Sequence, residues 1–245
     1  MLNKKFDGTD ISYWCIDRFE FYPRWYQSLF FKMFIDNKNT FLRWPRQSGK
    51  TSTLLHLSVF ILDNGLKIVN KNDILSKIKR FLGFKEEITY GNNDIIIRYL
   101  SHKYDASKYS FDNMCDILKS SDYYKSKIDN GDIVINDQSL IISFGDKHII
   151  FGIAKDEEIK DFDYTFYDDI FNDRFYHHYF DYIKKSEINI FTGIGHYYNN
   201  IIKYVNDFKE FHVTLEMTDQ YGKDRSKILK EQLSDKFYSM ECLCK

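Results

Sequence analysis

This chain has few cysteines, and it lacks long apolar runs and an excess of charge of one sign. Its 245 residues include 4 cysteines, and only Cys242 and Cys244 lie close together, so no zinc-binding set is visible. We therefore expect reduced thiols in a cytosolic protein. No apolar run approaches the roughly 18 residues that span a bilayer, and the N-terminus lacks the apolar stretch of a signal peptide. The sequence predicts no association with a membrane.

The charge and the composition exclude other classes of protein. A formal net charge of −1 excludes a uniformly basic nucleic-acid coat protein but leaves room for a local basic patch. Hydrophobic residues make up 43% and aromatic residues 18%, which provides for a sizeable core and excludes global disorder. His177 and His178 are adjacent, but no second pair of ligands accompanies them, so we assign them a structural or surface role.

Apolar runs and helical periodicities alternate along the chain. Three short runs at 132–136, 139–144 and 148–152, separated by turns, predict a small meander. The alternation elsewhere predicts an α/β fold with a mostly parallel central sheet flanked by helices. Longer strands are predicted at 40–44, 94–100, 163–171, 188–195, 210–217 and 236–243, and helices at 50–62, 103–121, 172–186, 196–208 and 223–234.

One stretch, RWPRQSGKTST at 43–53, contains Gly-Lys-Thr between a predicted strand and a predicted helix. That order is the context of a phosphate-binding loop, although Trp44 replaces the Gly expected six residues before the Lys. Backbone N–H groups at the start of such a helix bind phosphate, and Lys50 would reach the β- and γ-phosphates. Thr51 would supply a hydroxyl ligand to Mg²⁺. The stretch predicts an unusual P-loop.

Two carboxylates end the apolar run TFYDDI. A P-loop enzyme needs an acid on a second strand to hold Mg²⁺, and Asp168 fits that role. Asp169 fits the role of positioning and deprotonating the attacking water. The alternative is that the pair caps a helix after an edge strand.

Two further positions have chemistry that suits a nucleotide. The amide of Gln27, in FYPRWYQ, both donates and accepts hydrogen bonds and so matches the edge of adenine. The alternative is that this aromatic stretch is the core of an N-terminal helix. Thr192 ends the next predicted strand, where a hydroxyl could sense the γ-phosphate.

Together these motifs resemble the ATPase domain of the large terminase subunit, the DNA-packaging motor of tailed bacteriophages and herpesviruses. That family has a variant loop without the leading Gly, which PRQSGKT matches. WYQ is similar to its adenine motif, TFYDDI to its Walker B strand and IFTGIG to its coupling motif. The resemblance covers nearly the whole chain in the right order and implies a P-loop NTPase fold of the RecA/ASCE type.

The resemblance also implies roles for individual residues. Arg46 would reach the γ-phosphate as the loop arginine and link the nucleotide state to movement. The implied ATP-binding residues are Gln27, Arg46, Gln47, Ser48, Gly49, Lys50, Thr51 and Ser52, the catalytic residues are Asp169, Arg46 and Lys50, the magnesium ligands are Thr51 and Asp168, and Thr192 is the coupling residue.

By the same resemblance, residues 1–245 form a single P-loop ATPase domain. An adenine-motif segment would span 1–39, a nucleotide-binding core with an insertion at about 65–93 would span 40–216, and a closing segment would span 217–245. The cofactor would be Mg²⁺, and the substrate ATP. The partners would be double-stranded DNA, a portal protein and a small terminase subunit. The assembled chain would form a homo-oligomeric ring in the host cytoplasm, and the alternative in isolation is a monomer.

Three features depart from the family pattern. The second acid is Asp169 where the family usually has Glu, and its shorter side chain could slow hydrolysis. Phe151 and Gly152 stand where many relatives have an Arg before a Gly, so no arginine acting on a neighbouring subunit is assigned. No C-terminal nuclease domain is visible, so no nuclease activity is predicted. Two alternatives stay open, another P-loop ATPase of helicase-like type and a nucleotide-binding assembly module that does not hydrolyse ATP.

Overall fold

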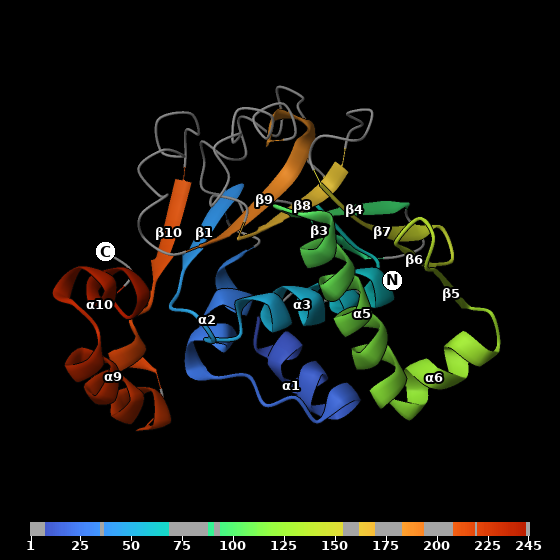
Figure 1. The fold of residues 1–245 in the computed structure, drawn as a ribbon. Helices are drawn as coiled ribbons and strands as arrows, with labels where there is room; N and C mark the ends of the chain where they lie inside the picture. The colour runs from blue at the N-terminus through green and yellow to red at the C-terminus, as the bar shows by residue number, and fades with distance from the viewer. Residues whose placement is uncertain are drawn as a thin grey trace.

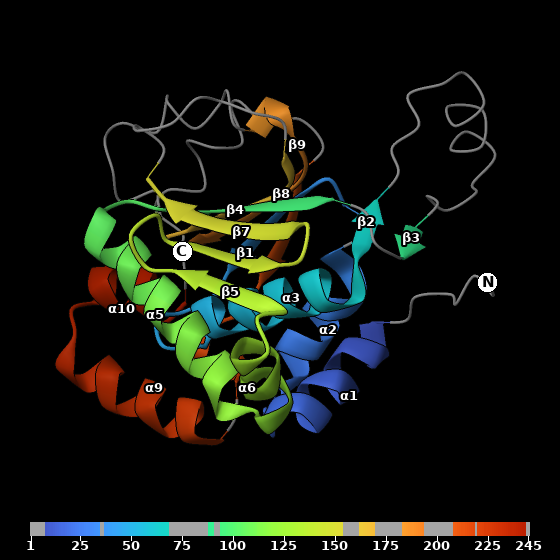
Figure 2. The same cartoon turned by 90° about the vertical axis from the view of Figure 1, so that its right-hand side faces the viewer.

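A computed structural model gives the fold, and Figures 1 and 2 show it from two sides. The described residues are 8–34, 37–68, 88–90, 94–153, 162–169, 183–193, 208–218 and 220–243. None of the described helices is long and apolar enough to span a bilayer. Cys15, Cys115 and Cys242 are buried free thiols.

An eight-stranded sheet in the order β10-β1-β9-β8-β4-β7-β6-β5 forms the centre of the molecule. From β10 to β7 all neighbouring strands are parallel, whereas β5, β6 and β7 form an antiparallel meander. The predicted fold class and the predicted meander are therefore confirmed. The strands are β1 (Asn39–Arg43), β4 (Ile95–Ser101), β5 (Ile133–Asn136), β6 (Ile141–Phe144), β7 (Lys147–Gly152), β8 (Phe162–Asp168), β9 (Ser186–Gly193) and β10 (Phe208–His212).

Helices cover one face of this sheet (Figures 1 and 2). The central helix α3 (Lys50–Asn64) is buried almost throughout and ends at Gly65, which adopts the left-handed φ of 61° that favours glycine. Around it lie α1 (Gly8–Phe19), α2 (Trp25–Met33), α5 (Tyr104–Ser120) and α6 (Asp122–Asp129).

Aromatic side chains fill the space between α3 and the helices beside it. The indole of Trp14 on α1 lies edge-on to Phe60 and Tyr124, and the ring of Phe19 stacks on Tyr124. Each aromatic pair of this kind adds about 0.5–1.5 kcal/mol beyond the burial of its apolar surface. The high aromatic content of the chain is therefore used in the core that supports α3.

Part of the predicted secondary structure lies outside the described residues. This applies to the helical piece within the insertion at about 65–93, to nearly all of the helix at 172–186 and to the helix at 196–208. The described ends of the insertion form a two-stranded antiparallel sheet, β2 (Leu66–Ile68) with β3 (Ile88–Tyr90).

The C-terminal prediction was wrong in its last strand and partly wrong in the strand predicted at 210–217, which ends with β10 at His212 and is followed by a 3-10 helix at Leu215–Met217. Residues predicted as a last strand, 236–243, mostly form the helix α10 (Asp235–Glu241), which follows α9 (Gln220–Gln232). Tyr238 and Cys242 are four residues apart and are both buried against Leu215, so the apolar spacing is that of a helix face and not that of a strand.

A hydrogen bond joins this C-terminal part to α2. Leu215 belongs to the short 3-10 helix η5 (Leu215–Met217), which precedes α9. The indole Nε1 of Trp25, at the start of α2, donates a hydrogen bond of 3.0 Å to the carbonyl of Met217. The C-terminal helices α9 and α10 lie beyond the β10 edge of the sheet (Figure 1).

Candidate nucleotide-binding site

The predicted site residues meet where parallel strands end. In parallel strands the carboxyl ends lie along one edge of the sheet, and β1, β9 and β8 are neighbours there. The register pairs Leu42 on β1 with Thr192 on β9, and Ser101 on β4 with Asp168 on β8. The loop after β1, the acid pair and the coupling threonine are thereby brought together.

The loop itself requires a glycine at residue 49. Gly49 has a φ of +84°, and a Cβ on it would lie 2.9 Å from the side-chain nitrogen of Gln27. Gln47 also has a left-handed φ of 59°. The missing first Gly has a structural explanation, because Trp44 is fully buried and its indole packs edge-on against Tyr26 and Phe30. The loop therefore leaves the core at Trp44 and takes its special backbone geometry from Gln47 and Gly49.

Helix α2 supports the loop from behind. The hydroxyl of Tyr26 donates to the Ser48 carbonyl at 2.8 Å. The amide of Gln27 donates to the Thr53 hydroxyl at 2.7 Å, and its oxygen accepts the Arg24 backbone N–H at 2.8 Å. Gln27 is only 3% exposed, so its amide serves protein contacts in this structure. Adenine recognition by Gln27 remains a prediction.

The ammonium of Lys50 lies inside the loop. Its Nζ donates to the carbonyls of Trp44 and Pro45, at 3.0 Å each. Lys50 is 8% exposed, which places a positive charge at the start of α3 in a protected position. A cation there, next to the backbone N–H groups of the first helical turn, favours the binding of an anion such as phosphate.

Asp168 accepts hydrogen bonds from three hydroxyl groups. Thr51 and Tyr99 each donate to its Oδ2 at 2.7 Å, and Thr192 donates to its Oδ1 at 2.7 Å. These donors come from α3, β4 and β9, so the carboxylate ties the loop helix to two neighbouring strands. Sequence reasoning found Thr51 and Thr192 but missed Tyr99. The available signal was its place near the end of a predicted strand that runs beside the acid strand.

Asp169 has the backbone conformation of a strained residue. Its φ is 54°, and its backbone N–H donates to the hydroxyl of Thr192 at 3.1 Å. The Thr192 hydroxyl thus accepts from the backbone N–H of Asp169 and donates to the carboxylate of Asp168, which fixes both residues at the end of β8. Burial raises the pKa of the Asp169 carboxyl above its ordinary value, while the positive charge of Lys50 opposes that shift. A carboxyl with a raised pKa is a suitable general base.

A cleft of about 580 Å³ opens between this acid pair, the loop and α5. Pockets of a few hundred cubic ångströms are of the size that holds a small ligand. Apart from Leu55 on α3, one wall consists of predicted site residues, and the other wall belongs to α5, which was not predicted as part of the site. The lining residues are Arg46, Gln47, Gly49, Lys50, Thr51, Ser52, Leu55, Tyr109, Asn113, Asp116, Ile117, Asp168 and Asp169.

Gln27, Ser48 and Thr192 are the predicted site residues that do not line the cleft. All three are buried. Gln27 and Thr192 hold neighbouring groups in place, whereas Ser48 contributes its carbonyl to Tyr26. In this structure these three residues therefore stabilise the residues around the cleft and do not face it.

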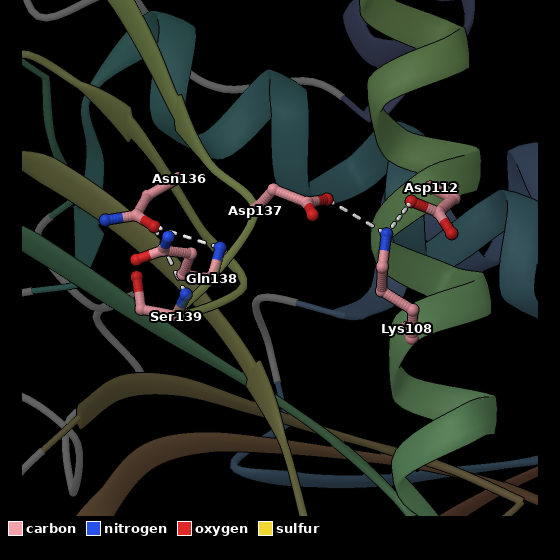
Figure 3. Close-up of polar contacts among 6 residues, drawn as sticks. All are labelled: Lys108, Asp112, Asn136, Asp137, Gln138 and Ser139. Carbon is pink, nitrogen blue, oxygen red and sulfur yellow. Dashed lines mark hydrogen bonds and ion pairs between the residues drawn. The ribbon is translucent and has the colours of Figure 1, made fainter.

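Helix α5, which forms the other wall, is held at its outer side by a charge cluster (Figure 3). The ammonium of Lys108 donates to Asp112 on the same helix and, at 2.9 Å, to Asp137 in the turn between β5 and β6. That turn is closed by Asn136, whose Oδ1 accepts backbone N–H groups two and three residues later. The cluster connects the cleft wall to the meander.

The oxygen donors at the end of β8 fit a magnesium ion. Mg²⁺ prefers carboxylate and hydroxyl oxygens together with phosphate oxygens. Asp168 and Thr51 are already adjacent, and both line the cleft beside Lys50. The residues present therefore suit the metal that the P-loop resemblance implies.

Comparisons with known proteins bear on the fold. No protein-family model matches the chain, and no curated protein matches it either. Among solved structures, the large terminase ATPase domain of Thermus phage P74-26 matches with a TM-score of 0.63 and 10% identity, over 98% of this chain and 99% of that one.

Two longer proteins give similar matches. The large terminase of bacteriophage HK97 has a TM-score of 0.65 and 8% identity, over 97% of this chain and 55% of that one. A large terminase from a thermophilic bacteriophage, in complex with ATP-gamma-S, has a TM-score of 0.59 and 10% identity, over 91% and 52%. These matches confirm the fold that the sequence motifs implied, and the chain has the fold of phage large-terminase ATPase domains.

Proposed function

We propose that this chain is the ATP-hydrolysing motor domain of a viral large terminase, which drives double-stranded DNA into a procapsid. One observation carries the proposal, the hydrogen-bonded group formed by Thr51, Asp168 and Thr192. It joins the helix of the phosphate loop to the ends of two neighbouring strands. A P-loop ATPase needs these groups together to hold a nucleotide and its metal.

The chemistry would be the attack of water on the γ-phosphate of ATP. Asp169 lines the cleft and would hold the water and take its proton. Lys50 and Arg46 would neutralise charge that develops on the phosphate oxygens. Thr51 and Asp168 would hold Mg²⁺, which would supply further neutralisation of phosphate charge.

The phosphate must compete for Lys50. In the structure, the ammonium is bonded to two carbonyls of the loop, so part of the binding free energy would be used to redirect it. Charged groups held in a protected site act more strongly than the same groups in water. The loop therefore keeps its cation close to the phosphate position without exposing it.

We infer the partners from the fold alone. DNA contacts would be made to backbone phosphates, because packaging must ignore sequence, and they would weaken as salt is raised. A portal protein and a small terminase subunit would complete the machine, with several copies of this chain in a ring within the host cytoplasm. The fold likeness to terminase ATPase domains supports this placement.

Steady-state hydrolysis of Mg-ATP tests the proposal. Wild type would be compared with Lys50→Ala and Asp169→Asn at several protein concentrations, with and without duplex DNA. We expect turnover in the wild type, its loss in both variants, and an increase with protein concentration if a ring forms. Failure of the wild type to bind Mg-ATP would exclude the P-loop function.

A second candidate is a nucleotide-binding assembly module that does not hydrolyse ATP. The observation in its favour is the short side chain of Asp169 where relatives usually have Glu, in a left-handed backbone conformation. Mg-ATP binding without turnover under every condition would support it, and recovery of turnover in Asp169→Glu would show that the shorter acid is the cause. A helicase-like P-loop ATPase would instead unwind a labelled duplex.

A further inference from the structure

A buried tyrosine contacts the acid that would hold the metal. The hydroxyl of Tyr99 lies 2.7 Å from Oδ2 of Asp168, and the ring is fully buried. The ring packs against Phe151 and Phe166, with centroid distances of 5.0 and 6.4 Å. Packing on both neighbours leaves the phenol little freedom to turn away from the carboxylate.

Tyr99 and Thr51 donate to the same oxygen but differ in their surroundings. Thr51 lines the cleft and is partly exposed, so its hydroxyl can turn toward a nucleotide and its metal. Tyr99 does not line the cleft. Its ring is fully buried, so its hydroxyl stays beside Asp168.

We propose that Tyr99 is a positioning residue, which fixes the Asp168 carboxylate in the orientation that the magnesium of Mg-ATP requires. The inference rests on the proposed function of the same site. When Thr51 turns to the metal, Tyr99 and Thr192 remain as donors, one to each carboxylate oxygen. Partners that orient metal ligands in this way typically change metal affinity by about 10–100-fold when they are removed.

The test is the magnesium dependence of nucleotide binding in Tyr99→Phe. A fluorescent ATP analogue that is not hydrolysed would be titrated into each protein at increasing Mg²⁺ and, separately, in EDTA. We expect the Mg²⁺ concentration for half-maximal binding to rise about tenfold, the lower end of the usual range for such partners. Affinity in EDTA should equal that of the wild type, because the loop still binds the phosphates.

The chain offers a matched control in Tyr164→Phe. Tyr164 on β8 is also fully buried, and its hydroxyl donates to the Leu66 carbonyl at 2.8 Å, with no contact to the acid pair. This variant loses a buried phenol hydroxyl just as Tyr99→Phe does. It should bind the analogue as the wild type does at every Mg²⁺ concentration.

Other outcomes would overturn the inference. An unchanged magnesium dependence in Tyr99→Phe would show that Asp168 needs no such donor. An equal loss of affinity with and without Mg²⁺, together with a melting temperature lower than that of Tyr164→Phe, would assign the hydroxyl a purely structural role. If the wild type bound no Mg-nucleotide, the proposed function would fail as well, so the two failures are distinguishable.

A second inference comes from helix α9, which lies beyond the β10 edge of the sheet. Lys223, Lys227 and Lys230 on α9 are separated by four and three residues, which places them on one side of the helix. All three are exposed, and they line one hollow of about 440 Å³ together with Glu216, Ser226 and Tyr238.

The charges of this lysine row are largely uncompensated. Glu216 is the acid in the hollow, and it already accepts a hydrogen bond of 2.7 Å from the hydroxyl of Tyr238. Lys227 approaches Asp224 at 4.0 Å, a pair so exposed that it adds little. Neither Lys223 nor Lys230 makes an ion pair with any residue that the structure describes. In a chain of net charge −1, such a row is a local basic surface.

We infer that this row contacts the phosphate backbone of duplex DNA, an inference that also rests on the proposed function. Seven residues of helix extend about 10 Å, and the phosphates of one strand follow at about 3.4 Å along the duplex axis, so the row spans about three phosphates. Lysines on flexible stems suit a partner whose backbone repeats and whose sequence is ignored.

The salt dependence of binding to a labelled blunt duplex tests this. In the triple variant Lys223→Gln, Lys227→Gln and Lys230→Gln, the slope of log affinity against log salt should fall by roughly 2.7, about 0.9 for each lost phosphate contact. A control triple variant, Lys103→Gln, Lys119→Gln and Lys125→Gln, removes three exposed lysines elsewhere and should keep the slope.

An unchanged affinity and slope in the α9 variant would overturn the inference, as would a wild type that hydrolyses ATP but binds no duplex. Loss of binding to a polyglutamate probe, with duplex affinity kept, would assign the row to an acidic protein instead. ATP binding should be normal in both triple variants, which separates this result from a failure of the proposed function.

Discussion

The two walls of the cleft are built in opposite ways. On the wall formed by the loop and β8, most polar groups have a partner, as the contacts of Lys50, Thr51 and Asp168 illustrate. On the α5 wall, Tyr109 is 66% exposed, and the side chain of Asn113 makes no hydrogen bond to a described residue. The side chains of the first wall are held in one arrangement by their hydrogen bonds, whereas side chains of the second wall can be substituted with little cost to the fold.

The comparison predicts that the largest effect follows from Lys50→Ala. Loss of a preorganised donor to a developing charge typically costs about 100- to 1,000-fold in turnover. We expect a loss of that size in steady-state ATP hydrolysis. The control is Lys119→Ala, an exposed lysine on α5, which should hydrolyse ATP as the wild type does. A small effect at Lys50 would mean that the two walls do not differ in the proposed way.

The second prediction concerns pH. Because burial raises the pKa of Asp169, its carboxylate becomes protonated, as pH falls, at a higher pH than that of an ordinary aspartate. If the carboxylate takes the proton of water, kcat/KM should fall by about tenfold per pH unit below that raised pKa. In Asp169→Asn this limb of the profile should be absent.

The raised pKa of Asp169 also affects stability, but here a rise in pH lowers the free energy of unfolding, whereas it raises kcat/KM. The folded chain binds the Asp169 proton more tightly than the unfolded chain does. Its contribution to the free energy of unfolding is therefore present at low pH and is lost as pH rises through the raised pKa. Urea unfolding of wild type and Asp169→Asn across that range measures the difference, which should shrink toward acidic pH.

The third prediction separates the two interpretations of Gln27. In Gln27→Ala the hydroxyl of Thr53 and the N–H of Arg24 lose a partner, which should lower the free energy of unfolding by about 1–3 kcal/mol. If Gln27 only supports the loop, discrimination between ATP and GTP should stay as in the wild type. A collapse of that discrimination in a folded variant would instead support recognition of adenine.

The smallest effect is expected on the α5 wall. Asn113→Ala removes a half-buried amide that makes no hydrogen bond to a described residue, so kcat should be unchanged and KM for ATP should change by at most about threefold, which is about 0.7 kcal/mol. Kinetics at saturating and limiting ATP would measure both. A large fall in kcat would show that α5 takes part in the chemistry and would remove the contrast between the walls.

The contrast also explains what the sequence could reveal. The loop wall was predictable because its signals are local, with Gly-Lys-Thr between a strand and a helix and a carboxylate pair after an apolar run. The α5 wall depends on where a helix packs after the chain has crossed the sheet, and no local pattern records that. Tyr99 was missed for the same reason, since its partner Asp168 is far away in sequence.

The wrong C-terminal strand has a related cause. Short apolar segments fit both a strand and a helix, and only tertiary packing separates them. Here Tyr238 and Cys242 pack on Leu215, which selects the helical spacing. At Trp44 the sequence departs from the usual loop pattern, but the structure keeps the loop, because the indole packs against Tyr26 and Phe30.

The short helix α2 gives the two ends of the chain a common mechanical element. Its nine residues extend about 13 Å, and within them Gln27 braces the phosphate loop while Trp25 holds the start of the C-terminal helices. Gln27 is almost fully buried, whereas Trp25 is 49% exposed. A displacement of α9 would therefore act first on the exposed bond of Trp25 to Met217 and only then on the buried bonds by which Gln27 holds the loop.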